Sequence, residues 1–328
     1  MKYFITGATG FIGGQVAEQL LEAGHEVTAL VRNEGRAGHL KKLGAKIATG
    51  DIADKQSMRA SMTGADGVFH IAAWYKVGVK NKSVAEKINV TGTRNVLELM
   101  QELEIKKGVY TSTLAVFSDT HGRLVDESYR YDGPHLSEYD RTKWLAHYHV
   151  ALPMIQNGLP LVIVQPGAVY GPGDTSQLGE TFRDYLLKKL PAIPKDVRLC
   201  WAHVDDTAKG HILAMEKGNP GENYIIAGPP HTLEEAFTIA EKITGIKPPK
   251  MRLAPGMMKF MSKLASLFAF LPLPQNFTAE SLRVLAGTSY LGSNEKAKRE
   301  LGYTPRPLQE GLKETLQYMM KELNFLTQ

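Results

Sequence analysis

The sequence predicts an α/β fold in which a doubly wound parallel sheet is followed by a smaller, mostly helical C-terminal cap. Short apolar runs rich in β-branched residues alternate with segments of helical periodicity through the first half of the chain. A glycine-rich turn directly follows the first run and opens the first helical segment. After Tyr170 the alternation gives way to loops and prolines. Alternating strands and helices form parallel sheets, and the change of texture indicates a second region.

Each element follows from its own local pattern. Apolar residues recur at helical spacing in residues 14–21 and 84–103, which predicts helices there. In the second half, a strand at 201–204 leads into a helix that ends at Lys217, and a further strand covers 224–227. The predicted strands of the first half are residues 3–5, 27–31, 46–49, 67–71, 108–111 and 161–165.

The glycine turn has the sequence TGATGFIG over residues 6–13. A tight turn requires Gly7, close approach of the backbone to a pyrophosphate requires Gly10, and close packing of the helix on the strand requires Gly13. The N–H groups at the start of the helix then face the phosphates. The motif therefore predicts a Rossmann-type dinucleotide site, to which Thr9, Phe11 and Ile12 also belong.

This site assigns residues 1–171 and 201–228 to a dinucleotide-binding domain. Residues 172–200 and 229–328 form the predicted substrate-binding cap. A chain of 328 residues is long enough for two such units.

The end of the second strand decides between the two nicotinamide cofactors. A carboxylate about 20 residues past the glycines binds the ribose 2′-hydroxyl of NAD, whereas an arginine accommodates the 2′-phosphate of NADP. Arg32 occupies this place, and Arg36 can support the phosphate. Glu34 is a rival ligand for the ribose. The sequence favours NADP(H), and NAD(H) remains the alternative.

Bulk properties exclude several classes of protein. The formal net charge is +5, but the basic residues form no run that would follow a nucleic-acid backbone. Cys200 is the single cysteine and cannot form an internal disulfide. The chain opens directly into a strand without a secretory leader, so we expect a cytoplasmic protein. The apolar stretch 257–274 is interrupted by Lys259 and Lys263, so we expect no transmembrane segment.

The chain resembles the extended short-chain dehydrogenases/reductases of the NAD-dependent epimerase/dehydratase superfamily. The glycine turn carries this resemblance, and VTALVRN at 27–33 is similar to the dihydroflavonol reductase branch. The resemblance implies cofactor contacts by Asp51, Ile52, Ala72, Ala73, Pro166 and Val169. Further matching segments are HIAA at 70–73, NVTGT at 89–93, QPGAVYGP at 165–172, HVDD at 203–206 and LGY at 301–303.

The catalytic residues are predicted from a tyrosine and a lysine four positions apart. Tyr139 and Lys143 have this spacing, but so do Tyr185 and Lys189. Only the first pair is preceded by a strand that ends in hydroxyl residues, of which the last is Thr113. Ligands of parallel sheets bind at such strand ends.

These residue types suit hydride transfer to a carbonyl. Tyr139 would donate a proton to the oxygen, and the Lys143 ammonium would lower the pKa of Tyr139 from its usual value near ~10. The resemblance implies that Lys143 also binds the nicotinamide ribose and that Thr113 bonds the reacting oxygen. Asn89 is a candidate for a proton relay.

The substrate side is predicted from the loops after the fourth and fifth strands and from the cap. An apolar segment, 257–271, either covers an apolar substrate as a lid that includes Phe268 and Phe270, or packs as an ordinary helix. His70 and His203 have no second histidine or carboxylate at ligand spacing, so we expect packing roles and no metal. The predicted wall comprises Trp74, Tyr75, Val116, Phe117 and Tyr170, with Val169 beside them.

Three functions remain open. The leading interpretation is an NADP(H)-dependent reductase of an apolar ketone or aldehyde. A sugar-nucleotide epimerase or dehydratase shares the fold and the residue set, although Gln165 stands where many sugar-nucleotide relatives have arginine. A cofactor-sensing protein without turnover is the third, but it would commonly lose Tyr139 or Lys143. The partner is a small molecule, and a homodimer through the helical segments 84–103 and 138–157 is possible by resemblance.

Overall fold

The computed structural model describes residues 1–78, 81–267 and 278–324, and within them it contains a seven-stranded sheet. Every pairing in this sheet is parallel, and the strand order is β10-β6-β5-β4-β1-β2-β3. The order runs in opposite directions from β1, so β1 and β4 meet at the switch point where ligands of such folds bind. The doubly wound α/β fold predicted from the sequence is therefore confirmed.

The strand bounds agree closely with the sequence patterns. The predicted strands of the first half differ from the observed ones by at most one residue at either end. The strands are β1 (Lys2–Thr6), β2 (Glu26–Val31), β3 (Lys46–Thr49), β4 (Gly67–His70), β5 (Gly108–Thr111), β6 (Leu161–Pro166) and β10 (Asn223–Ile226).

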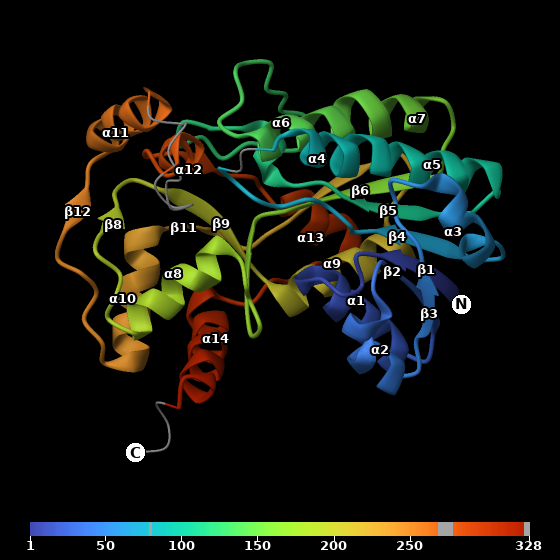
Figure 1. Cartoon of the computed structure of the whole chain (residues 1–328), viewed down its shortest axis with the longest axis horizontal. Helices are drawn as coiled ribbons and strands as arrows, with labels where there is room; N and C mark the ends of the chain where they lie inside the picture. Colours follow the sequence, from blue (N-terminus) through green and yellow to red (C-terminus); the bar gives the residue numbers. More distant parts are fainter. Residues whose placement is uncertain (79–80, 268–277, 325–328) are drawn as a thin grey trace.

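Helices cover both faces of this sheet (Figure 1). One hydrophobic core lies between the sheet and α1 (Phe11–Glu22), α2 (Gly38–Lys42), α9 (Val204–Lys217) and α13 (Glu295–Leu301). The other lies beneath α3 (Lys55–Met62), α5 (Thr93–Glu102) and α6 (Glu138–Ala146), with α4 (Ser83–Glu86) and α7 (Leu152–Gln156) at their ends. Alternate strand residues supply the two cores, because successive side chains point to opposite faces. Short 3-10 turns, η1 (Glu34–Arg36) and η3 (Leu114–Phe117), follow β2 and β5.

The long helices of the second face are interrupted by π-helical turns. The turn η2 (Lys87–Gly92) separates α4 from α5, and η4 (His147–Ala151) separates α6 from α7. These turns contain Asn89 and His147. A π turn inserts one extra residue into a helix and is frequent at functional sites.

The second region combines small sheets with helices, as Figure 1 shows at the left. Strand β9 (Arg198–His203) pairs with β7 (Ala168–Tyr170), β11 (Pro230–Thr232) and β13 (Ser289–Tyr290). Two short strands, β8 (Ile193–Pro194) and β12 (Arg252–Leu253), form a separate pair. The helices are α8 (Gln177–Leu186), α10 (Leu233–Thr244), α11 (Pro255–Leu267), α12 (Ala279–Val284) and α14 (Leu308–Glu322).

Two segments pack with a different part of the molecule than the predicted domain boundaries imply. The strand expected at 201–204 belongs to the small sheet around β9 and not to the seven-stranded sheet. Ala297, Leu301 and Tyr303 were predicted to belong to the cap, but they pack in the core beneath α1 and α9. The reason is that α13 returns the chain to β10 before α14 leaves it again.

Candidate active site

The glycine turn between β1 and α1 is shaped for close approach of a ligand to the backbone. Gly7 has a φ of +78°, and a Cβ atom there would lie 2.7 Å from the Ala72 nitrogen. A Cβ atom on Gly13 would lie 2.2 Å from the Gly7 oxygen. Both positions therefore require glycine, Gly7 for its left-handed backbone and Gly13 for lack of space.

The N-terminus of α1 is open to an anion. Its N-cap is Gly10, so no side chain caps the helix, and the first turn contains no acidic residue. Thr9 and Gly10 are exposed, and Phe11 and Ile12 are half-buried beside them. Free backbone N–H groups and the helix dipole both favour a phosphate here, so these residues fit the pyrophosphate of a dinucleotide.

A shallow hollow of about 260 Å³ lies at the carboxyl ends of β2 and β3. Arg32 and Asp51 line it together with Thr49, Gly50, Asp54 and Ser57. Ile52 is buried next to Asp51, and the Asn95 amide bonds its carbonyl at 2.8 Å. The predicted contacts at Arg32, Asp51 and Ile52 thus lie together, on the same sheet edge as the glycine turn.

The charged groups after β2 differ in their availability. Glu34 bonds the Lys41 ammonium and the Thr49 hydroxyl, each at 3.0 Å, and these bonds lower the pKa of its carboxyl. Arg32 and Arg36 are both exposed. Within residues 1–78, 81–267 and 278–324, neither guanidinium has a hydrogen bond or an ion pair. Both guanidinium groups are therefore available to a ligand. The carboxylate of Glu34, the rival ligand for the ribose, is already hydrogen-bonded.

Lys143 lies behind the end of β5, on the inner face of α6. The helix begins after Ser137, whose hydroxyl accepts the Asp140 N–H at 3.1 Å. The Lys143 ammonium is buried and donates to the Thr111 carbonyl at 2.7 Å and to the Tyr110 hydroxyl at 3.1 Å. Burial lowers the pKa of Lys143 to about 7, because removal from water disfavours the charged form.

Tyr139 lies one turn before Lys143 and is half-buried. Its phenol lies close enough to the Thr113 hydroxyl for that group to influence the pKa of Tyr139, so the structure brings these two predicted catalytic groups together. The Tyr75 ring contacts it edge-on, with ring centroids 4.8 Å apart. Burial of the phenol and the neighbouring Tyr75 raise the pKa of Tyr139, while the Thr113 hydroxyl lowers it. The lowering that we expected from Lys143 is absent among the described residues, because that ammonium bonds Tyr110 and Thr111 instead.

Asn89 joins two parts of the site. Its Oδ1 accepts the Trp74 N–H at 2.7 Å, and its Nδ2 donates to the Trp74 carbonyl at 3.0 Å. The same Nδ2 donates to the Thr142 hydroxyl at 2.9 Å. The amide therefore fixes the loop after β4 against α6, immediately before Lys143. This geometry describes a positioning residue more closely than a proton carrier.

The residues predicted to form the substrate wall fall into two groups. Tyr75 is 54% exposed, and Trp74 is half-buried next to it. Val116 and Phe117 are fully buried with Cys200 and Ile225, and Tyr170 is buried against Trp201. The structure does not bring Val116, Phe117 and Tyr170 to an open surface, because their strand-end segments pack under the small sheet. Among the predicted cofactor contacts, Ala72 and Val169 are half-buried, Ala73 is exposed and Pro166 is buried.

The predicted lid lies partly outside the described residues. Phe268 and Phe270 belong to residues 268–277, which the structure does not describe. The described part is α11, in which Met258 and Ser262 are buried and Met257 and Phe260 are exposed. The lid over the substrate remains a prediction.

Two buried groups near the predicted catalytic pair, Tyr139 and Lys143, were not predicted. Asp140 accepts hydrogen bonds from Ser137 at 2.8 Å and from Tyr290 at 3.1 Å, and burial raises the pKa of its carboxyl to about 7. The Ser-x-x-Asp spacing at 137–140 is an N-cap pattern that could have indicated the first contact. The Ser112 hydroxyl and His147 Nδ1 lie 2.8 Å apart. Burial and the Lys143 charge lower the pKa of His147 to about 3, so it is neutral.

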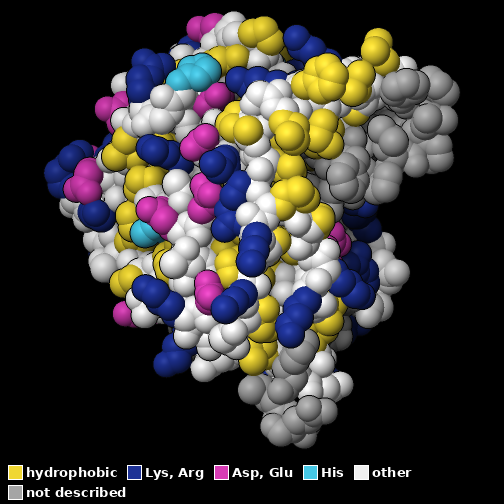
Figure 2. All heavy atoms as spheres, turned by 90° about the vertical axis from the view of Figure 1, so that its left-hand side faces the viewer, with side chains coloured by type: hydrophobic (Ala, Val, Ile, Leu, Met, Phe, Trp, Pro, Cys, Tyr) yellow, Lys and Arg dark blue, Asp and Glu magenta, His cyan; other side chains and the backbone are white. Residues whose placement is uncertain are grey.

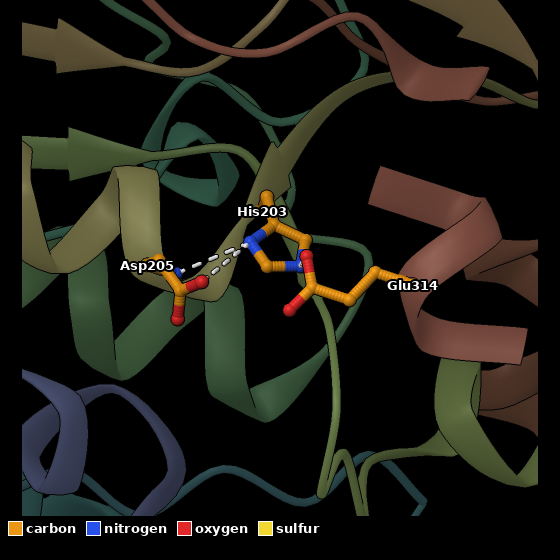
Figure 3. Close-up of side chains that lie close together, drawn as sticks. All are labelled: His203, Asp205 and Glu314. Carbon is orange, nitrogen blue, oxygen red and sulfur yellow. Dashed lines mark hydrogen bonds and ion pairs between the residues drawn. The ribbon is translucent and has the colours of Figure 1, made fainter. Parts of the chain in front are cut away.

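A third unpredicted cluster surrounds His203 (Figure 3). Asp205 Oδ2 lies 3.5 Å from its Nδ1 and Glu314 Oε2 lies 3.7 Å from its Nε2, so the expectation that His203 lacks a neighbouring carboxylate was wrong. Glu314 comes from α14, 111 positions away, and no spacing rule reveals it. The Arg306 guanidinium already pairs with Glu314 at 2.8 Å and with Asp205 at 3.4 Å. It supplies the cation that these carboxylates need, so we assign the cluster to structure. His70, in contrast, lies between the hydroxyls of Thr6 and Thr93, at 2.8 and 3.0 Å.

In residues 1–78, 81–267 and 278–324, no helix combines the length and the apolar character that are needed to span a bilayer.

The parallel sheet, the glycine turn and the pair formed by Tyr139 and Lys143 define an NAD(P)-dependent enzyme of the extended short-chain dehydrogenase/reductase type. The model of the NAD dependent epimerase/dehydratase family matches residues 3–227, and the chain belongs to this family. The resemblance stated from the sequence is therefore confirmed, and the protein binds a nicotinamide dinucleotide.

Individual relatives include reductases. The chain is 34% identical to a Synechocystis sp. protein named as a candidate dihydroflavonol 4-reductase, over 76% of this chain and 74% of the relative. It is 30% identical to the 4-hydroxy-2-methyl-3-oxo-4-farnesyl-3,4-dihydroquinoline-1-oxide ketoreductase of Stigmatella aurantiaca, over 95% of both chains. The crystal structure of gox2253 matches with a TM-score of 0.85 and 31% identity, covering 98% of both chains.

Proposed function

We propose that the protein is an NADPH-dependent reductase that converts an apolar ketone or aldehyde into an alcohol. The observation that carries this proposal is the arrangement at the carboxyl end of β5, where Thr113 adjoins Tyr139 and the buried Lys143 donates to the Thr111 carbonyl behind them. This end of the sheet is shared with the glycine turn, so a substrate beside Tyr139 would lie next to the nicotinamide.

Three side chains of the protein have separate roles in the proposed reaction. NADPH, when bound, supplies the hydride for the carbonyl carbon. Tyr139 donates its phenolic proton to the carbonyl oxygen as negative charge builds there. The Thr113 hydroxyl donates a hydrogen bond to the same oxygen and so orients the substrate. Lys143 would hold the nicotinamide ribose beside Tyr139, and the phenolate that remains on Tyr139 recovers a proton from solvent.

The raised pKa of Tyr139 agrees with this role. Burial keeps the phenol protonated at neutral pH, which is the state that a proton donor needs before transfer. The Asn89 amide holds Trp74 and Thr142 and thereby fixes both the substrate loop and the helix that carries Lys143.

The preference for NADPH is supported by the charges after β2. Arg32 lines the hollow at that sheet edge, and Arg36 is exposed three residues after Asn33. Glu34, the rival ligand for a ribose 2′-hydroxyl, is engaged by Lys41 and Thr49. A 2′-phosphate would therefore find free guanidinium groups and no free carboxylate from this segment.

The apolar substrate is supported by the aromatic pair at the site and by a relative. Tyr75 presents its ring over Tyr139, and Trp74 precedes it. The printed name of the Stigmatella aurantiaca relative describes a farnesylated quinoline as the substrate. Gln165, at the place of the arginine of many sugar-nucleotide relatives, is fully buried and carries no charge with which to bind a pyrophosphate.

Parallel titrations of the ligand-free protein with NADPH and NADH, followed by assays on apolar ketones and aldehydes, test the proposal. We expect NADPH to bind about tenfold tighter, or ~1.4 kcal/mol. Arg32→Asp should remove this preference, whereas Arg198→Asp, at an exposed arginine of β9, should leave it unchanged. Tighter NADH binding together with NAD retained through purification would contradict the proposal. That outcome would favour an epimerase or dehydratase, which the family name also covers.

A further inference from the structure

The outer face of α11 carries a row of exposed apolar side chains. Met257, Phe260, Leu264 and Leu267 are 53%, 62%, 40% and 72% exposed. They are spaced by three and four residues, so they lie along one stripe of the helix. Another face, with Met258 and Met261, packs against Leu282 of α12 and against Ala286, which follows that helix. The helix is therefore apolar on two sides, and only one of them is covered by the described residues.

The surroundings of this stripe are basic. Between Gly245 and Leu267 the sequence contains no Asp or Glu. Lys259 and Lys263 are exposed and immediately precede Phe260 and Leu264, so they line one side of the stripe. Figure 2 shows hydrophobic side chains gathered on this face of the molecule with Lys and Arg side chains close by. The further basic residues of the segment are Lys247, Lys250 and Arg252, of which Arg252 pairs with Glu234 at 3.1 Å.

The stripe is structurally connected to the candidate active site. α11 packs on α12, whose first turn contains Glu280. Glu280 accepts the Gly78 N–H at 3.0 Å and pairs with Lys82 at 3.3 Å. This is the end of the loop that begins after β4 and carries Tyr75 over Tyr139. The helix that carries the apolar stripe is thus linked through α12 to the loop that carries Tyr75.

We propose that α11 docks on the surface of an anionic lipid membrane. The stripe enters the boundary between headgroups and acyl chains, and Lys259 and Lys263 face the lipid phosphates. A second copy of the chain fits this surface less well, because a two-fold contact through α11 would bring the lysines of both copies together. The docking is independent of the proposed reaction. If that reaction holds, the site would open beside the phase in which an apolar substrate is dissolved.

Flotation of the full chain with lipid vesicles tests this proposal. Vesicles of equal amounts of phosphatidylglycerol and phosphatidylcholine should bind the protein, and vesicles of phosphatidylcholine alone should bind it roughly 30-fold more weakly. The double variant Phe260→Ser/Leu264→Ser should lose about tenfold or more in affinity for the anionic vesicles. Lys259→Gln/Lys263→Gln should lose most of the preference for anionic lipid. Leu124→Ser, at an exposed leucine outside α11, should bind as the unmodified protein does.

The variants change exposed side chains, so their folding is checked by circular dichroism and by cofactor affinity, both of which should remain unchanged. Absence of binding to the anionic vesicles would overturn the proposal. So would equal binding by the serine variant. A third contrary result is a dimer in sedimentation velocity that the serine variant dissociates without any vesicle binding, because the stripe would then be an interface between copies of this chain.

Discussion

The helices α6 and α8 carry the same tyrosine-lysine spacing in opposite surroundings. In α6, Lys143 is buried behind β5 and Tyr139 stays half-open next to Thr113. In α8 the tyrosine is buried: the Tyr185 hydroxyl bonds Thr244 at 2.9 Å and also the Ile246 carbonyl. Lys189 is exposed and lies beyond the end of that helix. The difference teaches that the spacing alone does not identify a site, because only the first pair combines a buried lysine with a partly accessible tyrosine.

Removing the hydroxyl group of Tyr139 or of Tyr185 should give the largest difference between the two tyrosine-lysine pairs. Tyr139→Phe removes the proton donor, so kcat/KM for carbonyl reduction should fall by about 10²–10⁴ while cofactor affinity stays nearly constant. Tyr185→Phe removes a buried structural hydrogen bond and should lower the free energy of unfolding by about 1 kcal/mol without changing turnover. Steady-state assays and denaturant titrations measure both. Comparable turnover losses in the two variants would end the distinction.

The lysines should differ in the same sense. Lys143→Met replaces the ammonium with an apolar chain of similar length, so turnover should fall by about 10² or more and cofactor binding should weaken. Lys189→Met changes a solvated side chain and should leave both quantities within experimental error. Single-turnover kinetics at saturating cofactor separates the chemical effect from the binding effect, and unchanged chemistry in Lys143→Met would remove that residue from the mechanism.

The pH dependence of the free energy of unfolding should also distinguish Lys143 from Lys189. Burial lowers the pKa of Lys143 to about 7, whereas an unfolded lysine titrates near ~10.4. Between these values the unfolded chain binds more protons, so the free energy of unfolding should rise with pH across this window. Lys143→Met should flatten this part of the profile relative to the unmodified, ligand-free protein, and Lys189→Met should not. Parallel profiles for all three proteins would show that Lys143 is not desolvated in solution.

Asn89 extends the comparison, because its amide holds the loop after β4 against α6. Asn89→Ala leaves the Trp74 N–H and carbonyl without their partner, which should cost about 1–3 kcal/mol of stability. A positioning role also predicts a higher KM with a smaller change in kcat, which thermal unfolding and steady-state kinetics together can resolve. Asn219→Ala, at an exposed loop position before β10, serves as the control. A loss in kcat alone would restore the relay hypothesis.

The sequence predicted the elements whose causes are local. Strand bounds at 46–49 and 108–111 match those of β3 and β5, because short β-rich runs between turn residues leave little freedom. The glycine turn is equally local, since Gly7 and Gly13 contact residues nearby in sequence or on the adjacent strand.

The features that the sequence did not predict depend on contacts between residues far apart in the chain. The partners of Asp140 and His203, Tyr290 and Glu314, come from the C-terminal third, and tertiary packing alone brings them there. Val116 and Phe117 illustrate a different difficulty. An apolar pair after a strand end suits a substrate wall or a core equally well, and only the small sheet above them decides for the core.

The π-helical turn at Lys87–Gly92 has a consequence for insertions and deletions. Deleting one residue there would restore an ordinary helical turn and rotate one flank against the other by about 100°. The α5 flank buries Val96, Leu97, Leu99 and Met100, whereas α4 consists of Ser83–Glu86 and buries only Ala85 among its residues. The short flank would rotate, and Asn89 would lose its alignment with Trp74 while the sheet packing survived. A single-codon deletion in this stretch should therefore yield a folded protein with an impaired site.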